Sequence, residues 1–160
     1  MIEILWESSL PRPYDPQAVK DFCEEAADIC GLQPKQEISL VFTTDEQIAR
    51  LNGEYRNKAE PTDVLSFAFS ETEGWPEDQN EGLLGEVFIS TQMIGENAAY
   101  FQVDEEEELK RLIVHGFLHV LGHDHQTNNE EEPMLKKQEE ILKQLAHLNL
   151  KNFEQGKQSS

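Results

Sequence analysis

Between Asp15 and Gly31, apolar residues recur with the period of an α-helix. Asp15 is a suitable N-cap, Pro16 favours the first helical position and a glycine ends the pattern, so we predict a helix over 16–30. Its apolar face consists of Val19, Phe22, Cys23, Ala26, Ala27 and Cys30. We expect this face to pack on a sheet.

Four further segments have the β-branched and aromatic composition of strands. They lie at 1–6, 38–42, 64–69 and 84–90. The last two are separated by an acidic stretch with the turn-forming residues Gly74, Pro76 and Gly82. The pattern leaves open whether these two strands form a long-looped hairpin or are neighbours joined by a crossover.

Four more segments carry helix signals. They span 45–51, 91–100, 105–122 and 133–148. Residues 44–47 form a capping box at the start of the first. Ser90 or Thr91 caps the second, and Asp104 caps the third. The chain therefore contains about five helices.

The order of these elements predicts the fold class. Strands and helices do not alternate strictly, which favours an α+β domain with about five helices packed on one mixed sheet of about four strands. The chain has 160 residues, which fits one domain over 1–150. The polar segment 151–160 is expected to be a disordered tail.

The charge balance restricts the partners of this domain. The chain has 32 acidic and 13 basic side chains, a formal net charge of −19. This charge disfavours long-range attraction of nucleic acid, so an anionic substrate must be held by a few local cations.

The chain carries no signal of membrane insertion or secretion. No segment approaches the ~20 apolar residues of a membrane span, and residues 1–7 lack the basic and apolar regions of a signal peptide. Cys23 and Cys30 lie seven positions apart on one predicted helix, roughly 10.5 Å, which is too far for a disulfide. We expect reduced cysteines, a cytoplasmic location and no membrane partner.

Four of the five histidines lie within residues 115–125. His115 and His119 are one helical turn apart, so both imidazoles can reach one ion. The chain can then turn at Gly122 and return His125 as a third ligand. Three histidines with no fourth protein ligand leave one position open, which is typical of catalytic rather than structural zinc. The pattern predicts one Zn²⁺ per chain.

His123 and Asp124 lie beside His125 in the sequence. His123 competes for the third ligand position, but it lies one residue past Gly122, where the chain has little room to reverse. We therefore favour His125 and expect His123 to be exposed or beside a ligand. Asp124 either orients a ligand histidine or acts on the bound water, or it only caps the loop.

Gly116 occupies a position that matters for the reaction class. Metalloproteases with the motif His-Glu-x-x-His place a general-base glutamate directly after the first histidine. Because glycine stands at this position, the general base of these proteases is missing, which argues against peptide hydrolysis. A zinc-bound hydroxide can attack without that base. If the substrate is a phosphoester, a cation must then stabilise the charge on the phosphate.

Arg56 and Lys58 stand out in a chain that is short of cations. An arginine can grip two phosphate oxygens at once. From the residues alone, Arg56 is either such a phosphate ligand or an ordinary surface ion-pair partner.

Three segments together resemble the YbeY family of bacterial endoribonucleases. They are Tyr55-Arg56 through Pro61-Thr62-Asp63-Val64-Leu65-Ser66-Phe67, then Gly85-Glu86-Val87-Phe88-Ile89-Ser90, then His115 through His125. The last segment, His-Gly-x-Leu-His-x-x-Gly-x-Asp-His, is the most specific. The three segments occur in the order of the family.

The resemblance implies a single-domain, zinc-dependent hydrolase with a zincin-like metal-bearing helix. It implies cleavage of single-stranded RNA, in maturation of the 3′ end of small-subunit ribosomal RNA and in ribosome quality control. The partners would be ribosomal RNA and the ribosome or its small-subunit assembly proteins, not DNA. The resemblance carries His115, His119 and His125 over as zinc ligands and Arg56 as the residue needed for cleavage.

Two other functions fit parts of the pattern. One is a non-catalytic, zinc-containing ribosome-assembly factor, and the other, less favoured, is a metallopeptidase. For RNA cleavage, the acidic chain needs a local cationic patch. We expect it to consist of Arg50, Arg56, Lys58, Lys110 and Arg111.

Overall fold

The computed structural model describes residues 1–8, 14–56, 64–71, 81–123 and 132–151. The elements are β1 (Ile2–Trp6), α1 (Pro16–Cys30), β2 (Gln36–Thr43), α2 (Asp45–Arg56), β3 (Val64–Ala68), the 3₁₀ turn η1 (Phe69–Glu71), β4 (Gly82–Ser90), α3 (Thr91–Phe101), α4 (Glu105–Val120) and α5 (Pro133–Gln144). Within these described residues, the predicted α+β fold with four strands and five α-helices is confirmed.

The four strands form one mixed sheet in the order β1-β2-β4-β3. β1, β2 and β4 run parallel, whereas β3 pairs antiparallel with β4, with Leu65 opposite Phe88. The two strands that the sequence left open are therefore antiparallel neighbours at one edge of the sheet.

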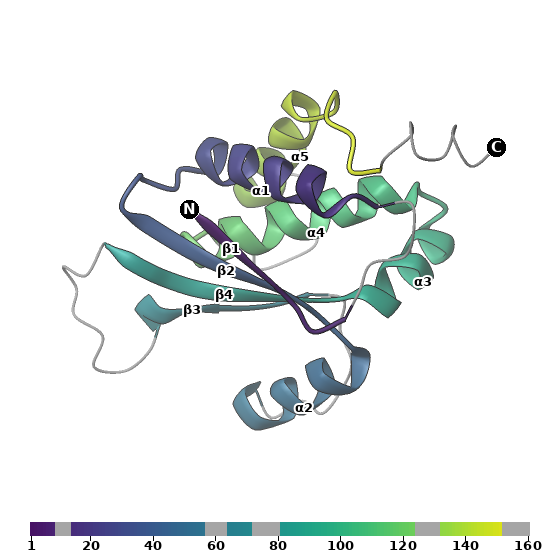
Figure 1. The fold of residues 1–160 in the computed structure, drawn as a ribbon, viewed down its shortest axis with the longest axis horizontal. Coiled ribbons are helices and arrows are strands. Elements are labelled where there is room, and N and C mark those ends of the chain that lie inside the picture. The colour runs from purple at the N-terminus through teal and green to yellow at the C-terminus, as the bar shows by residue number, and fades with distance from the viewer. Residues whose placement is uncertain (9–13, 57–63, 72–80, 124–131, 152–160) are drawn as a thin grey trace.

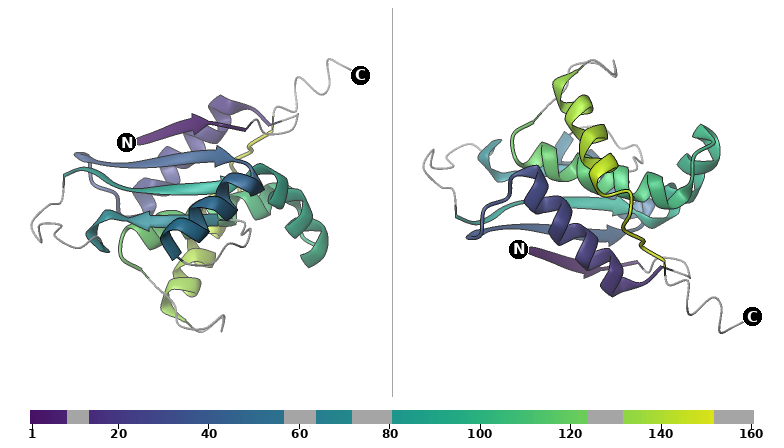
Figure 2. Two further views of the ribbon diagram at one scale, coloured as in Figure 1. Left: turned by 90° about the horizontal axis from the view of Figure 1, so that it is seen from below. Right: turned by 90° about the horizontal axis from the view of Figure 1, so that it is seen from above.

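The helices lie on both faces of this sheet. Figure 1 shows α1, α4 and α5 above the sheet and α2 below it, and the two views of Figure 2 show the same separation. All six residues of the predicted apolar face of α1 are buried, as expected. Asp15 caps α1 by accepting from the Gln17 amide, and Gly31 ends it at φ 112°. The capping residues thus determine where α1 begins and ends, and its apolar face determines which side is buried.

α4 is the central helix of the core. It contacts β3, β4, α1, α3 and α5, and most of its side chains are buried. The fully buried ones are Leu109, Ile113, Val114, Phe117 and Leu118. A helix with apolar residues on most of its surface is stable only when it is enclosed, and each large side chain contributes roughly 1.5–3 kcal/mol. Groups carried by α4 are therefore held in a rigid frame.

Two helices end at other residues than the pattern predicts. α2 continues past Leu51 to Arg56, and α5 ends at Gln144 rather than near 148. α5 ends early because the chain turns so that Leu145 and Leu150 enter the core. The Leu150 carbonyl then accepts from the Asp15 amide at 2.9 Å.

The cysteines are reduced and buried, as expected. Burial raises the pKa of both thiols, that of Cys30 to about 12. No described helix is long and apolar enough to cross a membrane. Of the predicted tail, residues 152–160 lie outside the described residues.

Candidate metal centre

His115 and His119 both lie on α4, one turn apart, as predicted. Asp104 starts this helix by accepting from the Glu107 amide at 3.2 Å. At its other end Gly122 adopts φ 98°, and its amide donates to the His119 carbonyl at 3.0 Å. The His123 amide donates to the Leu118 carbonyl at 2.9 Å, which completes a Schellman end. The chain thus turns directly after the two histidines.

The ring of His115 has a defined partner. Its Nδ1 lies 2.8 Å from Oε1 of Gln138, a buried residue of α5. This contact occupies one ring nitrogen and leaves Nε2 as the candidate metal ligand. The Nε2 atom of His119 is buried from solvent. Imidazole nitrogens are common zinc ligands, so these two residues fit the expected ion.

The other expected members of the centre are described only in part. His125 and Asp124 lie outside the described residues. His123 is half-buried, and burial followed by the charge of Lys137 lowers its pKa. Within the part of the chain that the structure describes, no three His, Cys, Asp or Glu side chains form a metal-binding group. The assignment of His125 as third ligand stays a prediction.

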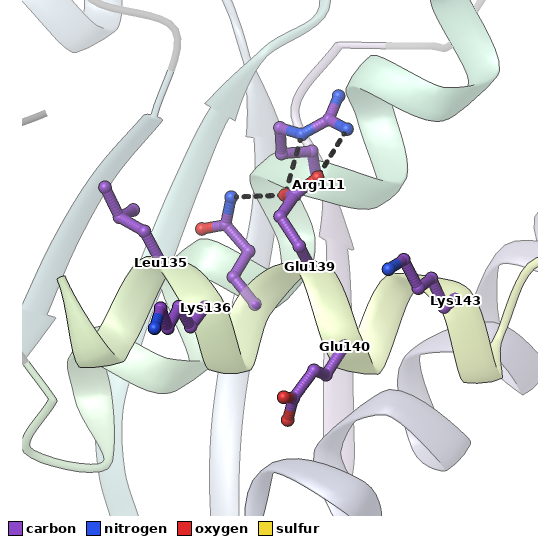
Figure 3. Close-up of a pocket in the computed structure, with 7 residues that line it drawn as sticks. Arg111, Leu135, Lys136, Glu139, Glu140 and Lys143 are labelled. Atoms are coloured by element: carbon purple, nitrogen blue, oxygen red, sulfur yellow. Dashed lines mark hydrogen bonds and ion pairs between the residues drawn. The ribbon is translucent and has the colours of Figure 1, made fainter. Parts of the chain in front are cut away.

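Gln138 is itself held by a chain of polar contacts. Its Nε2 donates to Oε2 of Glu139 at 3.2 Å. Glu139 in turn accepts from Nε and Nη2 of Arg111 at 3.3 and 3.2 Å. Figure 3 shows this pair between α5 and α4. Nη1 of Arg111 also lies 3.9 Å from Oε2 of Glu108.

The Arg111–Glu139 pair changes the charge equilibria of both partners. The hydrogen bond that Arg111 donates to Glu139 raises the pKa of Arg111, although partial burial acts in the opposite direction. Burial opposes ionisation of Glu139, but hydrogen bonds from Arg111 and Gln138 outweigh it and lower the pKa of that carboxyl. Both groups are charged at neutral pH. They line a groove of about 670 Å³ together with Leu135, Lys136, Gln138, Glu140 and Lys143.

Gly116 faces the sheet at very close range. A Cβ atom at this position would lie 2.5 Å from Cγ1 of Val87 and 3.4 Å from Oγ of Ser66. No side chain fits there unless the Val87 side chain shifts. The position that holds the general base in His-Glu-x-x-His enzymes therefore points into the core of this protein, and a glutamate is excluded on steric grounds.

Gly116→Ala is expected to lower the free energy of unfolding by about 1–3 kcal/mol, because overpacking outweighs the gain in helix propensity. Gly95→Ala, in α3, is the matched control. Its Cβ would lie 3.6 Å from the nearest atom, so we expect a gain of up to about 1 kcal/mol. Urea unfolding followed by circular dichroism measures both. Equal stabilisation by the two substitutions would contradict the close approach of α4 to β4.

Arg56 is the last residue of α2. The start of α2 is anchored, because the Asp45 amide donates to Oε1 of Gln92 at 2.8 Å and the Ser90 hydroxyl donates to the Asp45 carboxylate. The predicted capping bond from the Gln47 amide to Thr44 Oγ1 is present at 3.2 Å.

The Arg56 side chain and residues 57–63, including Lys58, lie outside the described part of the chain. α2 lies on the face of the sheet opposite α4 (Figure 1), and the chain after Arg56 continues into β3, the edge strand that contacts α4. The place of Arg56 in the site stays a prediction.

The prediction that Lys110 belongs to a cationic surface patch is wrong. Lys110 is buried, and its Nζ donates to the Leu148 carbonyl and lies 5.8 Å from the ring centre of Phe22. The ammonium satisfies a backbone acceptor inside the fold, so it does not reach a substrate. Arg111 is engaged with Glu139, and Arg50 donates to Gln47.

Gln138 was not predicted from the sequence. It is separated from His115 by 23 positions and lies on another helix. One signal was available: Met134, Gln138 and Ile141 share the buried face of α5, so an amide occupies an otherwise apolar stripe. A polar residue in such a position needs a buried partner.

Comparisons with known proteins identify the family. A family model described as Endoribonuclease YbeY matches residues 7–146. The chain belongs to the YbeY family. The Endoribonuclease YbeY of Shouchella clausii is 45% identical over 132 residues, covering 79% of this chain and 82% of that protein. That of Treponema denticola is 39% identical over 149 residues, covering 93% and 96%.

A solved structure has a similar fold. The solution structure of TM1509 from Thermotoga maritima has a TM-score of 0.60 and is 26% identical, covering 91% of this chain and 89% of that one. The arrangement of helices around the mixed sheet is thus shared with a protein of low sequence identity.

Proposed function

We propose that this member of the YbeY family is a zinc-dependent endoribonuclease that cuts single-stranded RNA. We further propose that it acts in the cytoplasm on the 3′ end of small-subunit ribosomal RNA and in ribosome quality control. The observation that carries the proposal is the endoribonuclease family match over residues 7–146, which includes the helical pair His115 and His119.

The proposed site divides the chemistry among few residues. Zinc held by His115, His119 and His125 would supply a water with a pKa lowered to about 7. The contact with Gln138 fixes the ring of His115. Arg56 binds the non-bridging phosphate oxygens and stabilises the charge that develops on the phosphodiester. Asp124 either orients a ligand histidine or takes the proton of the attacking water.

The acidic surface limits how this protein holds RNA. The net charge is −19, and the inward-facing Lys110 leaves fewer cations for phosphate contacts. We therefore propose that the ribosome or a small-subunit assembly protein delivers the RNA, and that the protein itself contributes a local grip around Arg56. Affinity for free RNA would then be weak and strongly dependent on salt.

The test is a digest of a ribosomal RNA fragment by the purified protein. The fragment is used once as a single strand and once annealed to its complement. We expect cuts in the single strand and an intact duplex. Equal cutting of both, or of neither under zinc saturation, would contradict the proposal.

A second candidate is a non-catalytic assembly factor in which zinc only fixes the loop after Gly122. The strong negative charge favours it, because phosphate binding normally requires cations. The absorption spectrum of a cobalt-substituted protein separates the two. Four coordination with an exchangeable water fits the enzyme, and four coordination without one fits the assembly factor. The core position of Gly116 disfavours a metallopeptidase.

A further inference from the structure

The polar contacts around His115 form a closed loop between two helices. Arg111 and His115 are four residues apart on α4, and Gln138 and Glu139 are adjacent on α5. The hydrogen bonds run from Arg111 to Glu139, between Gln138 and Glu139, and between Gln138 and His115. Each helix thus contributes two residues, and the loop returns to the helix from which it starts.

The first half of the loop fixes the orientation of the Gln138 amide. Glu139 accepts two hydrogen bonds from the Arg111 guanidinium, and an ionised carboxylate has only acceptors. The Gln138 atom 3.2 Å from Glu139 must therefore be the amide nitrogen. The reversed amide would place two acceptors against each other. Gln138 is buried, so water has little access to its amide group.

The second half of the loop fixes the proton of His115. With its nitrogen toward Glu139, the Gln138 amide presents its oxygen to Nδ1 of His115 at 2.8 Å. An amide oxygen accepts only, so Nδ1 must carry the hydrogen. The neutral ring then has its lone pair on Nε2. A neutral imidazole without such a partner has both tautomers available, and one of them has no lone pair on Nε2.

We propose that Gln138 is a positioning residue that holds His115 in the tautomer with its hydrogen on Nδ1 and its lone pair on Nε2 before any metal arrives. Arg111 and Glu139 support it by fixing the amide. This inference rests on the proposed metal centre, to which it adds a residue from α5. The His115 ring then needs no change of tautomer or orientation when the metal binds. The free energy of metal binding is therefore more favourable than for a ring that must first be reoriented.

The first variant is Gln138→Leu, which keeps the side chain's approximate volume and removes the acceptor. The ¹⁵N chemical shifts of His115 in the metal-free protein report the tautomer, and competition with a chromophoric chelator reports the affinity for Zn²⁺. We expect the wild type to show the hydrogen on Nδ1. The leucine variant should show mixed tautomers and bind Zn²⁺ about 10–100-fold more weakly.

Two further variants separate positioning from folding. Glu139→Ala removes an exposed side chain and leaves the core intact, yet it frees the amide to reverse and should also mix the tautomers. Glu140→Gln changes an exposed residue of α5 outside the loop and should alter neither readout.

The outcomes distinguish this inference from the proposed function. A folded Gln138→Leu protein with the wild-type tautomer, or with the wild-type affinity, would overturn the role of Gln138. If that variant does not fold, the Glu139→Ala protein decides by the same two readouts. A wild type that binds no Zn²⁺ would contradict the metal centre, whereas the metal-free tautomer of the wild type would still decide whether Gln138 orients His115.

Discussion

We expect the Arg56→Ala protein to keep one zinc per chain and to cut single-stranded RNA about 10²–10³-fold more slowly than the wild type. The expected loss follows from removal of a charged donor that acts on the transition state, where such groups contribute most. Zinc content is measured by atomic absorption, and cleavage rates are measured with an end-labelled ribosomal RNA fragment. Arg56 is the last residue of α2, and we expect the fold of the variant to be unchanged.

A charge-matched control is Lys35→Ala. Lys35 is exposed and lies 3.8 Å from Glu81, so its removal changes the net charge equally without touching the site. We expect wild-type cleavage from this variant. Full cleavage by Arg56→Ala would remove Arg56 from the mechanism, and loss of its zinc would show that Arg56 acts on the structure of the site. An Arg56→Lys protein with low activity would indicate that the bidentate grip is required.

The His119→Ala protein is expected to bind no zinc at micromolar concentration and to show only background cleavage. Removal of one of the three proposed imidazoles leaves two protein ligands, which are too few to hold the ion at this concentration. Zinc content after dialysis and cleavage of the same RNA are measured together. The stability of the metal-free form, compared with that of the metal-free wild type, verifies the fold.

His147→Ala is the matched control, because His147 is the one histidine outside residues 115–125 and is exposed. This variant should retain both zinc and cleavage. A His119→Ala protein that holds a full equivalent of zinc would exclude His119 as a ligand and would move the centre away from α4.

Local signals predicted the frame of the site. The caps at Asp15, Ser90 and Asp104 form as expected, since each depends only on the residue and the amides that follow it. The same holds for Gly122, whose positive φ ends α4 directly after the second histidine. The spacing of His115 and His119 is also a local property of a helix.

Long-range contacts could not be predicted in this way. The pairing of Gln138 with His115 depends on how α5 packs against α4, and the inward direction of Lys110 depends on where the Leu148 carbonyl comes to lie. The early end of α5 has a similar cause, because burial of Leu150 competes with one more helical turn. Tertiary packing overrides local propensity at each of these positions.

We propose that cleavage of ribosomal RNA by this chain depends on the bound metal ion. The most direct measurement is a digest of single-stranded ribosomal RNA by purified protein before chelation, after zinc is removed with a chelator, and after Zn²⁺ is restored. We predict cleavage that stops on removal and returns with one equivalent of Zn²⁺ in the wild type, but does not return in Arg56→Ala or His119→Ala. Cleavage that continues in protein with no detectable metal would exclude metal-dependent catalysis.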